Sequence, residues 1–352
     1  MNIEERIKSF ALLGESLRES INNNSGISVN GRDHSILQSL IKTQVNRNPW
    51  FTPENVTRAI TAIANELTEE NLVKWTSTYN GINDEVNPLR VAVIMAGNIP
   101  LVGFHDFLSV LITGNNLIAK TSSKDSELLL VITSILCKIN PQFKERIEFT
   151  DSTLANFDAV IATGSDNSSR YFDYYFGKYP NIIRRNRNSI AILEGDETDE
   201  EMEKLGTDLF SYFGLGCRNV SKIYIPEGFD LGKRSKNWDS FHNIVNHTKY
   251  SNNYDFNKAV YIVNKENFHD TGYLLIKEDT RISSPVSVLY FEYYESQDAI
   301  KQVPELLKKK IQCVIGKHYI PFGQAQSPHL WDYADGIDTI EFLLKKKLAG
   351  IL

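Results

Sequence analysis

The pattern of apolar positions along the chain changes near residue 90. Before it, apolar residues recur at helical intervals, as in residues 55–67 just after Pro53, a residue favoured in the first turn of a helix. From residue 90 onward, short β-branched runs alternate with longer helical patterns. This alternation predicts an α/β fold with parallel sheets covered by helices on both faces, preceded by a helical region.

Three apolar runs of the first α/β stretch are typical of strands buried on both faces, and each ends in a polar turn. The runs are residues 91–95, 117–120 and 157–162. Their turns contain Asn98, the pair Lys120 and Ser122, and the pair Gly164 and Ser165. Because ligands of doubly wound sheets bind beyond the carboxyl ends of the strands, these turns form the predicted ligand-binding edge.

A second α/β stretch begins near Asn188, so the boundary between two lobes is expected between residues 180 and 195. Thr198 and Glu201 have the spacing of a capping box, which predicts a helix running to about Phe213. The strands predicted in this stretch are residues 189–193, 222–225, 259–263, 273–276, 286–290 and 311–315.

The composition is that of a globular protein and argues against two kinds of partner. The chain has 352 residues, of which 41% are hydrophobic and 23% charged, and a net charge of -6, which disfavours nucleic-acid phosphates. No apolar stretch approaches the roughly 20 residues that span a bilayer, so no membrane span is expected. The short basic cluster of residues 184–187 is interpreted as a solvated turn, with an anion site as the alternative.

The three cysteines bear on location and on metal binding. Their odd number and unpaired spacing, with an N-terminus that lacks a signal-peptide pattern, indicate a reducing compartment, and we expect the cytoplasm. No zinc-ligand spacing is present, so no metal is expected. Cys137 and Cys313 lie inside apolar runs and are interpreted as small core residues.

Cys217 has surroundings that suit a nucleophile. Gly214 and Gly216 permit close approach of a ligand to the sulfur, and the adjacent cation of Arg218 favours the thiolate. A buried packing role is the alternative, because cysteine is among the most buried residue types.

The turn residues of the first sheet have both a chemical and a plain structural interpretation. Asn98 has a side-chain amide that suits an oxyanion, although Asn also caps helices and fills turns. Lys120 and Ser122 lie where a cofactor ribose or phosphate rests in such sheets, although a lysine there is often only solvated. Gly164 and Ser165 suit a pyrophosphate at a helix N-terminus, or an ordinary loop-to-helix junction. A G-x-G-x-x-G fingerprint is missing from the sequence.

Taken in order, these segments resemble the aldehyde dehydrogenase superfamily. Within it they are similar to the acyl-CoA reductases related to the fatty-acid reductase of bacterial luciferase operons, the LuxC-like family. The segments are Ala-Gly-Asn-Ile-Pro at 96–100, Ile-Ala-Lys-Thr-Ser-Ser at 118–123, Ala-Thr-Gly-Ser at 162–165 and Phe-Gly-Leu-Gly-Cys-Arg-Asn at 213–219, followed by Ser-Ser-Pro-Val at 283–286 and Pro-Phe-Gly at 321–323.

The resemblance implies two doubly wound α/β lobes of the aldehyde dehydrogenase type, with the active site in the cleft between them. Residues 1–187 would form a helical region and a cofactor-binding domain, and residues 188–325 the catalytic domain. Residues 326–352 would return to the cofactor domain or form an oligomer contact.

The same resemblance assigns roles to the candidate residues. Cys217 corresponds to the nucleophile and Asn98 to the oxyanion-hole asparagine. The expected cofactor is NADPH, with NADH as the alternative, and the positions implied for cofactor binding are Lys120, Ser122, Gly164 and Ser165.

Two departures from the family pattern are informative. Hydrolytic members have a water-activating glutamate just before the strand at 189–193, where Arg184 is the best match here. Without that base, an acyl-enzyme thioester is expected to accept hydride or exchange with a thiol rather than hydrolyse. Arg281 falls where members often place a glutamate on the nicotinamide ribose, which suggests NADPH phosphate or coenzyme A as its ligand.

We therefore expect a reductase that converts a long-chain acyl group, presented as acyl-CoA or an acyl-protein thioester, to an aldehyde. An acyl-transferring protein partner and a homo-oligomer are also implied by the resemblance. The alternatives are an oxidative aldehyde or semialdehyde dehydrogenase of the same superfamily, and a non-catalytic binding protein with a degenerate fold.

Overall fold

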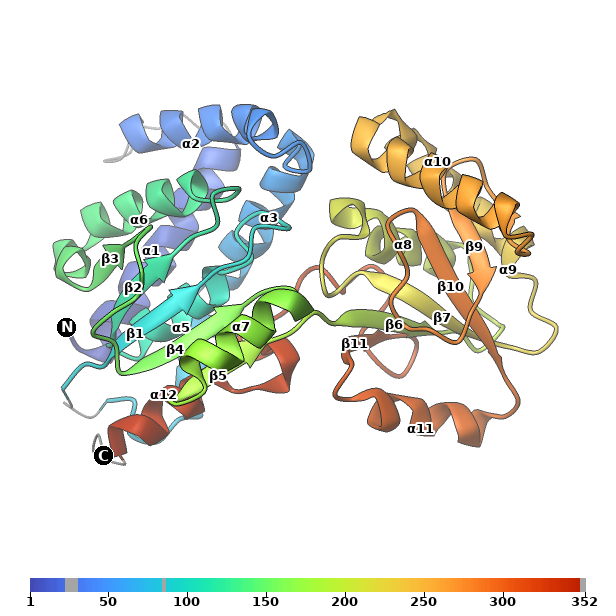
Figure 1. The fold of residues 1–352 in the computed structure, drawn as a ribbon. Coiled ribbons are helices and arrows are strands. Elements are labelled where there is room, and N and C mark those ends of the chain that lie inside the picture. Colours follow the sequence, from blue (N-terminus) through green and yellow to red (C-terminus); the bar gives the residue numbers. More distant parts are fainter. Residues whose placement is uncertain (23–30, 84–86, 349–352) are drawn as a thin grey trace. The chain divides into compact units, whose positions relative to one another are not determined.

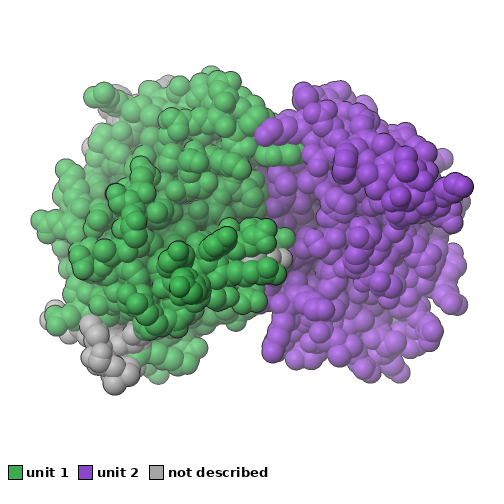
Figure 2. All heavy atoms as spheres, viewed as in Figure 1, with its two compact units in different colours: residues 1–186, 329–352 green, residues 187–328 purple. Residues whose placement is uncertain are grey.

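In the computed structural model, residues 1–22, 31–83 and 87–348 are described (Figure 1). The chain forms two compact units, coloured separately in Figure 2. Unit 1 comprises residues 1–186 and 329–352, and unit 2 comprises residues 187–328. Each unit has its own sheet and its own hydrophobic core. Within the described ranges, no helix is both long and apolar enough to cross a bilayer.

Unit 1 contains a five-stranded, fully parallel sheet in the order β3-β2-β1-β4-β5. The chain enters this sheet after a helical N-terminal region, as predicted. The elements of unit 1 are α1 (Ile3–Ile21), α2 (Gly31–Thr43), η1 (Gln44–Asn46), α3 (Pro53–Glu66), α4 (Glu69–Thr76), β1 (Arg90–Ile94), α5 (Phe104–Ile112), β2 (Asn116–Lys120), α6 (Glu127–Ile139), η2 (Pro141–Glu145), β3 (Ile147–Phe149), β4 (Ala159–Thr163), α7 (Asp166–Phe176), β5 (Asn181–Arg184), η5 (Ala334–Gly336) and α12 (Thr339–Leu348).

Alternate residues of the central strands bury opposite faces of this sheet. Val91 and Val93 of β1 belong to the main core with α1, α5, α6 and α12. Ala92, between them, belongs to a smaller core with Phe172 and Phe176 of α7. Because side chains alternate across a strand, a strand that is apolar throughout requires helices on both faces. The predicted α/β class is confirmed.

The C-terminal segment packs within unit 1 and meets a buried ion pair there. Arg184, the last residue of β5, pairs with Asp106 of α5, and both side chains are buried. The same guanidinium donates a hydrogen bond of 2.9 Å to the hydroxyl of Thr339, where α12 begins. The interpretation of residues 184–187 as a solvated turn is therefore wrong for Arg184. A strand that ends inside the unit can bury a cation only where a carboxylate meets it.

Unit 2 contains a six-stranded sheet in the order β11-β6-β7-β10-β9-β8, parallel except for the edge strand β8. Its helix α8 begins with the predicted capping box, in which Thr198 and Glu201 bind each other's backbone amides. The elements of unit 2 are β6 (Asn188–Ile192), α8 (Asp199–Phe210), η3 (Ser211–Gly214), β7 (Val220–Pro226), α9 (Leu231–Arg234), η4 (Ser235–Asn246), α10 (Thr248–Val263), β8 (His269–Asp270), β9 (Leu275–Glu278), β10 (Val288–Tyr294), α11 (Gln297–Leu307) and β11 (Ile311–Ile315).

One predicted strand, residues 259–263, is wrong because these residues end the helix α10. The buried residues of α10 are Tyr250, Tyr254, Asn257 and Tyr261, which recur at helical intervals. Val263, from the apolar run that indicated a strand, is 79% exposed. The tyrosine face packs against the sheet and overrides the β-branched preference of the last turn.

We predict that Arg184→Ala lowers the free energy of unfolding of unit 1 by about 3–5 kcal/mol, because it leaves the Asp106 carboxylate buried without its partner. Urea unfolding of the purified protein measures this change. The matched control is Arg185→Ala, which removes an exposed ion pair to Asp173 and should cost less than about 1 kcal/mol. Equal effects of the two substitutions would contradict a buried role for Arg184.

Candidate active site

The sheet of unit 1 brings its predicted site residues to one edge. β1 lies between β2 and β4, all three run parallel, and their carboxyl ends lead to Asn98, to Lys120 with Ser122, and to Gly164 with Ser165. After β1, the chain adds β2 and β3 on one side of it and then β4 and β5 on its other side. This reversal of strand order next to β1 is the arrangement of a topological switch point. Such a point is where an open α/β sheet binds its ligand.

The turn that carries Asn98 is held against the loop that follows β2. Asn98 itself is exposed. A Cβ atom added to the neighbouring Gly97 would lie 2.5 Å from the Ser122 hydroxyl oxygen, so only glycine fits there. The Gly97 carbonyl oxygen also accepts a hydrogen bond of 3.3 Å from the side-chain amide of Asn48.

A buried carboxylate closes the same turn. Asp125 accepts a hydrogen bond of 2.6 Å from the backbone N–H of Leu101, a residue with a φ of 58°. Asp125 is 6% exposed, and its second oxygen has no hydrogen-bond partner among the described residues. Burial raises the pKa of Asp125 to about 7, against the lowering effect of the Leu101 N–H.

Lys120 and Ser122 have local partners that fix the loop after β2. The Lys120 ammonium donates a hydrogen bond of 2.9 Å to the Ser152 carbonyl oxygen. The Ser122 hydroxyl accepts one of 3.3 Å from the backbone N–H of Lys124. These contacts hold a cation and a hydroxyl at the carboxyl end of β2.

Gly164 and Ser165 form the junction between β4 and α7. Ser165 is the N-cap of α7, and its hydroxyl accepts a hydrogen bond of 3.3 Å from the Ser168 N–H. A Cβ atom on Gly164 would lie 2.8 Å from atoms of Ser168 and Phe172, so this strand and helix approach closely only because residue 164 is glycine. The positive end of the α7 dipole therefore faces the switch point of the sheet.

Cys217 lies on a turn of unit 2 between η3 and β7, and the residue is partly buried. Tyr212, Phe213 and Gly214, which precede this turn, all have left-handed backbones, with φ values of 52°, 60° and 75°. A left-handed conformation costs a non-glycine residue roughly 1–2 kcal/mol, so the surroundings must impose it.

Asn219 imposes much of that shape. Its side-chain oxygen accepts a hydrogen bond of 2.8 Å from the Gly216 N–H, and its NH2 group donates bonds of 2.9 Å to the carbonyl oxygens of Asp208 and Ser211. Asn219 is 2% exposed, so these bonds are made away from water. One side chain thus joins the end of α8 to both sides of the Cys217 turn.

Two later segments pack against the residues that lead into the same turn. The Asp208 carboxylate accepts hydrogen bonds from the N–H groups of Gly323 and Ala325, at 2.6 and 3.0 Å. Burial raises the pKa of Asp208 to about 6, while those two N–H groups lower it. On another side, Phe213 and Gly214 share a hollow of about 30 Å³ with residues 284–289. Residues 284–286 and Gly323 therefore lie against the segments that precede the cysteine turn.

Ser189 of β6 contacts both the Cys217 turn and the strand β11. Its hydroxyl donates a hydrogen bond of 3.0 Å to the Cys217 carbonyl oxygen and lies 3.0 Å from the sulfur of Cys313. Cys313 and Cys137 both pack against core clusters, as predicted, and burial raises the pKa of the Cys137 thiol. All three cysteines lie in described residues and form no disulfide.

The two arginines that the resemblance places at family glutamate positions, Arg184 and Arg281, are both paired with carboxylates. Arg184 is buried against Asp106, which leaves it unsuited to bind substrate or cofactor. The exposed guanidinium of Arg281 makes two hydrogen bonds to Asp279, at 2.9 and 2.6 Å, and lies over the ring of Tyr290. These bonds raise the pKa of Arg281 and lower that of Asp279. A ligand phosphate at Arg281 would have to compete with this carboxylate.

Three of the histidines contact neighbouring groups of the protein. His105 lies 2.8 Å from the Leu330 carbonyl oxygen, while His318 and His329 face the carboxylates of Glu194 and Glu66, at 3.2 and 3.0 Å. In the part of the chain that the structure describes, no group of three His, Cys, Asp or Glu side chains is arranged for a metal ion.

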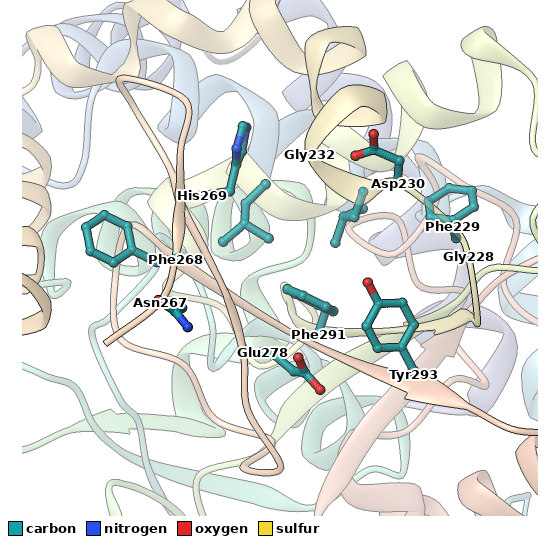
Figure 3. A pocket seen from close by; sticks show the side chains of 12 residues that line it. Gly228, Phe229, Asp230, Gly232, Asn267, Phe268, His269, Glu278, Phe291 and Tyr293 are labelled. Atoms are coloured by element: carbon teal, nitrogen blue, oxygen red, sulfur yellow. The ribbon is translucent and has the colours of Figure 1, made fainter. Parts of the chain in front are cut away.

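Unit 2 also has an open hollow of about 550 Å³, shown in Figure 3. Phe229, Phe268, Phe291 and Tyr293 line it together with the carboxylates of Asp230 and Glu278, among others. The chain reaches this hollow beyond the carboxyl end of β7, whereas Cys217 precedes the amino end of that strand. The hollow is therefore separate from the cysteine turn.

Asn98 belongs to unit 1 and Cys217 to unit 2. Their convergence on one substrate carbonyl, and the cleft between the lobes, remain predictions from the resemblance.

Comparison with solved structures places the fold among the aldehyde dehydrogenases. Aldehyde dehydrogenase 21 from Physcomitrella patens, in complex with succinate, is 12% identical with a TM-score of 0.66, over 98% of this chain and 84% of that one. The NAD+ complex of an aldehyde dehydrogenase from Bacillus cereus is 13% identical with a TM-score of 0.58, over 85% of this chain and 69% of that one.

The sequence comparisons identify the family more narrowly. The model of the acyl-CoA reductase (LuxC) family matches residues 29–231, which is more than half of the chain, and the chain belongs to this family. A long-chain acyl-protein thioester reductase of Aliivibrio fischeri is 26% identical over 215 residues. That match covers 55% of this chain and spans 44% of the relative, less than half of its length.

Sequence reasoning missed the polar residues that shape the two turns. Asp125, Asp208 and Asn219 stand in segments where a polar residue indicates a cap or a solvated position. Their sequence neighbours contain no feature that reveals burial. The one usable signal is that Asn219 directly follows Cys217-Arg218, inside the segment that resembles the family.

We predict that Asn219→Ala lowers the free energy of unfolding of unit 2 by about 3 kcal/mol, because three buried backbone groups lose their partner. Asn219→Asp should not restore stability, since a carboxylate cannot donate to the two carbonyl oxygens. Urea unfolding measures both. The control, Asn253→Ala, removes an exposed bond to the Lys249 carbonyl oxygen and should stay within about 0.5 kcal/mol of the wild type. A small effect of Asn219→Ala would show that the turn holds its shape without this side chain.

The raised pKa of Asp125 predicts a pH-dependent stability. Between its unfolded value, about 4, and about 7, the folded protein holds a proton that the unfolded chain has released. The contribution of Asp125 to stability therefore falls as pH rises through this window, and stays low above it. Asp125→Asn removes the titration, so its stability relative to the wild type should increase from pH 5 to pH 8. Urea unfolding across this range would reveal a flat difference if the carboxyl is not buried as described.

Proposed function

We propose that this chain reduces an activated acyl group to an aldehyde through a covalent acyl-enzyme on Cys217. The observation that carries the proposal is the backbone next to this cysteine, in a member of the acyl-CoA reductase family. The residues that lead into the turn have strained left-handed conformations, and hydrogen bonds from Asn219 hold the turn. Strain that the surroundings impose at one turn is typical of a functional position rather than of a core residue.

A nicotinamide cofactor fits the switch point of unit 1. Lys120 supplies a cation, Ser122 and Ser165 supply hydroxyls, and the N-terminus of α7 beyond Gly164 favours an anionic phosphate. Gly97 and Gly164 leave no room for a Cβ atom, which brings backbone close to this edge. When bound, such a cofactor supplies hydride. NADPH is the proposed form, with NADH as the alternative.

The chemistry of the chain's own residues follows from these positions. The Cys217 thiolate attacks the carbonyl carbon of a thioester, and the negative charge that develops on oxygen is stabilised by the Asn98 amide and the Cys217 backbone N–H. The thiol of the donor leaves, and the acyl group remains on Cys217. After reduction, the thiohemiacetal on Cys217 collapses: its C–S bond breaks, the aldehyde leaves and the Cys217 thiolate is regenerated.

The environment of Arg184 favours reduction over hydrolysis. Release of a free acid needs a carboxylate that activates water next to the acyl-enzyme. At the position that matches this base, the chain has a guanidinium already committed to Asp106 and Thr339. The thioester on Cys217 should therefore persist until it is reduced or exchanged with a thiol.

The proposed substrate is a long-chain acyl group carried by coenzyme A or by a protein thiol. The curated relative is named as a long-chain acyl-protein thioester reductase, which supports this class of donor. An acyl-transferring protein partner and a homo-oligomer are part of the same proposal.

An assay with acyl-CoAs of graded chain length tests the activity. It follows the oxidation of NADPH, and separately of NADH, by the loss of the absorbance of the reduced cofactor. We expect aldehyde formation with long chains and faster turnover with NADPH. Oxidation of added aldehydes by NAD+ or NADP+, with no reduction of any acyl-CoA, would instead show an oxidative dehydrogenase. If the protein neither reduces acyl-CoAs nor oxidises aldehydes, a non-catalytic binding protein would be supported.

We predict that Cys217→Ala abolishes covalent labelling by a radiolabelled acyl-CoA, because the attacking sulfur is gone. Asn98→Ala should still label but slow turnover by about a hundredfold, as expected for the loss of one oxyanion donor. The matched control is Cys137→Ala, whose thiol packs against the core of unit 1 and should not be needed. Label retained by the Cys217→Ala protein would refute the assignment of the nucleophile.

A further inference from the structure

Two contacts, a packing contact and a hydrogen bond, hold the loop after β2 against the turn that carries Asn98. The Ser122 hydroxyl occupies the space that a Cβ atom of Gly97 would need, on one side of Asn98. On the other side, the Asp125 carboxylate accepts the hydrogen bond of 2.6 Å from the Leu101 N–H. The loop itself is closed by the Asp125 N–H, which donates 2.9 Å to the Ser122 carbonyl oxygen. Asn98 thus lies between two points that one loop holds.

The contact at Leu101 holds a conformation that the chain disfavours. A leucine with a φ of 58° lies in the left-handed region, which costs a residue with a Cβ atom roughly 1–2 kcal/mol. The carboxylate that holds it is 6% exposed and has one oxygen with no partner among the described residues. A buried carboxyl with so few partners is costly to fold, which indicates that the turn geometry it enforces has a use.

We propose that Asp125 is a positioning residue that fixes the Asn98 amide for oxyanion stabilisation, an inference that rests on the proposed function. Asp125 acts through the acceptor that it offers to the Leu101 N–H. Without that acceptor, the backbone at Leu101 relaxes toward right-handed values and carries the Asn98 turn with it.

The same loop carries the proposed cofactor residues. Lys120 and Ser122 precede Asp125 on one short connection, and Ser122 touches Gly97 directly. The cofactor loop and the oxyanion turn therefore form one mechanically joined structure. Displacement of this loop should change the position of Asn98. The loop after β2 therefore sets both the proposed cofactor residues and the proposed oxyanion donor.

The test compares three substitutions at Asp125 with matched controls, using long-chain acyl-CoA and NADPH as probes. Asp125→Ala should lower kcat by about tenfold to a hundredfold, the effect of a misplaced catalytic group, with KM for acyl-CoA changed less than about twofold. Asp125→Asn keeps an acceptor oxygen of the same length and should stay within about threefold of the wild type. Asp125→Glu keeps the charge but moves the carboxylate by one methylene, and should lose kcat as Asp125→Ala does.

The control for the substitution to alanine is Asp158→Ala. Asp158 accepts a hydrogen bond of 2.7 Å from the Arg90 N–H, which is the same kind of contact at the opposite end of β1. This variant should keep the wild-type kcat. Alkylation of Cys217 by iodoacetamide should be unchanged in every variant, because the turn of Cys217 belongs to unit 2.

The outcomes separate the two hypotheses. If the wild type reduces acyl-CoA but Asp125→Ala and Asp158→Ala have equal kcat, the role of Asp125 is wrong and the proposed function stands. An Asp125→Asn protein as slow as Asp125→Ala would also overturn the inference, since charge rather than the acceptor would then matter. If the wild type reduces no thioester, the proposed function fails and the inference with it. Should Asp125→Ala not fold, the contrast between Asp125→Asn and Asp125→Glu decides the question alone.

Discussion

The architecture of the candidate site depends on buried polar side chains that bind backbone groups across short turns. Asn219 makes this clearest, because one amide satisfies the Gly216 N–H and the carbonyl oxygens of Asp208 and Ser211 at once. The groups of Ser211 and Gly216 belong to the segment that leads from α8 into the cysteine turn through two non-glycine residues with left-handed backbones. In the absence of water, each such group must find a protein partner, so the fully bonded arrangement excludes alternatives that leave one unpaired.

In unit 1 a buried polar side chain also binds a backbone group of a short turn, but fewer of its atoms are hydrogen-bonded. The Asp125 carboxylate holds a left-handed leucine, and one of its oxygens has no partner among the described residues. Its raised pKa expresses the cost of that burial. The two proposed halves of the chemistry therefore lie on turns that are strained and held by polar residues, while the parallel sheets behind them supply rigid support.

The ion pair of Arg184 with Asp106 connects the fold to the proposed reaction. The family resemblance places Arg184 where hydrolytic members are expected to have a water-activating glutamate, and the contacts of Arg184 fix β5 against α5 and the start of α12. Under the proposed function, Arg184 is constrained by folding as well as by chemistry. The carboxylate of Asp106 and the hydroxyl of Thr339 account for a cation that is buried at the end of a strand.

Most of the elements could be predicted from the sequence, because their signals are local. Continuous apolar runs marked β1, β2 and β4, and the spacing of Thr198 and Glu201 marked the start of α8. The strand predicted at 259–263 failed because a β-branched run was weighed without the tyrosine face at 250, 254, 257 and 261. Residue order also identified Cys217, Asn98 and the cofactor turns as candidates, through the resemblance to a known family.

The sequence by itself determined the α/β class, the succession of strands and helices, and the turns where chemistry is expected, since each of these follows from periodicity or from a motif of adjacent residues. Only the tertiary structure decided which polar residues are buried and what they bind. Asp125 meets Leu101, Arg184 meets Asp106, and Asp208 meets Gly323, each across a separation that no local pattern encodes. Such pairs form because folding removes water from groups that must then bind each other, and that choice is made by the packed chain as a whole.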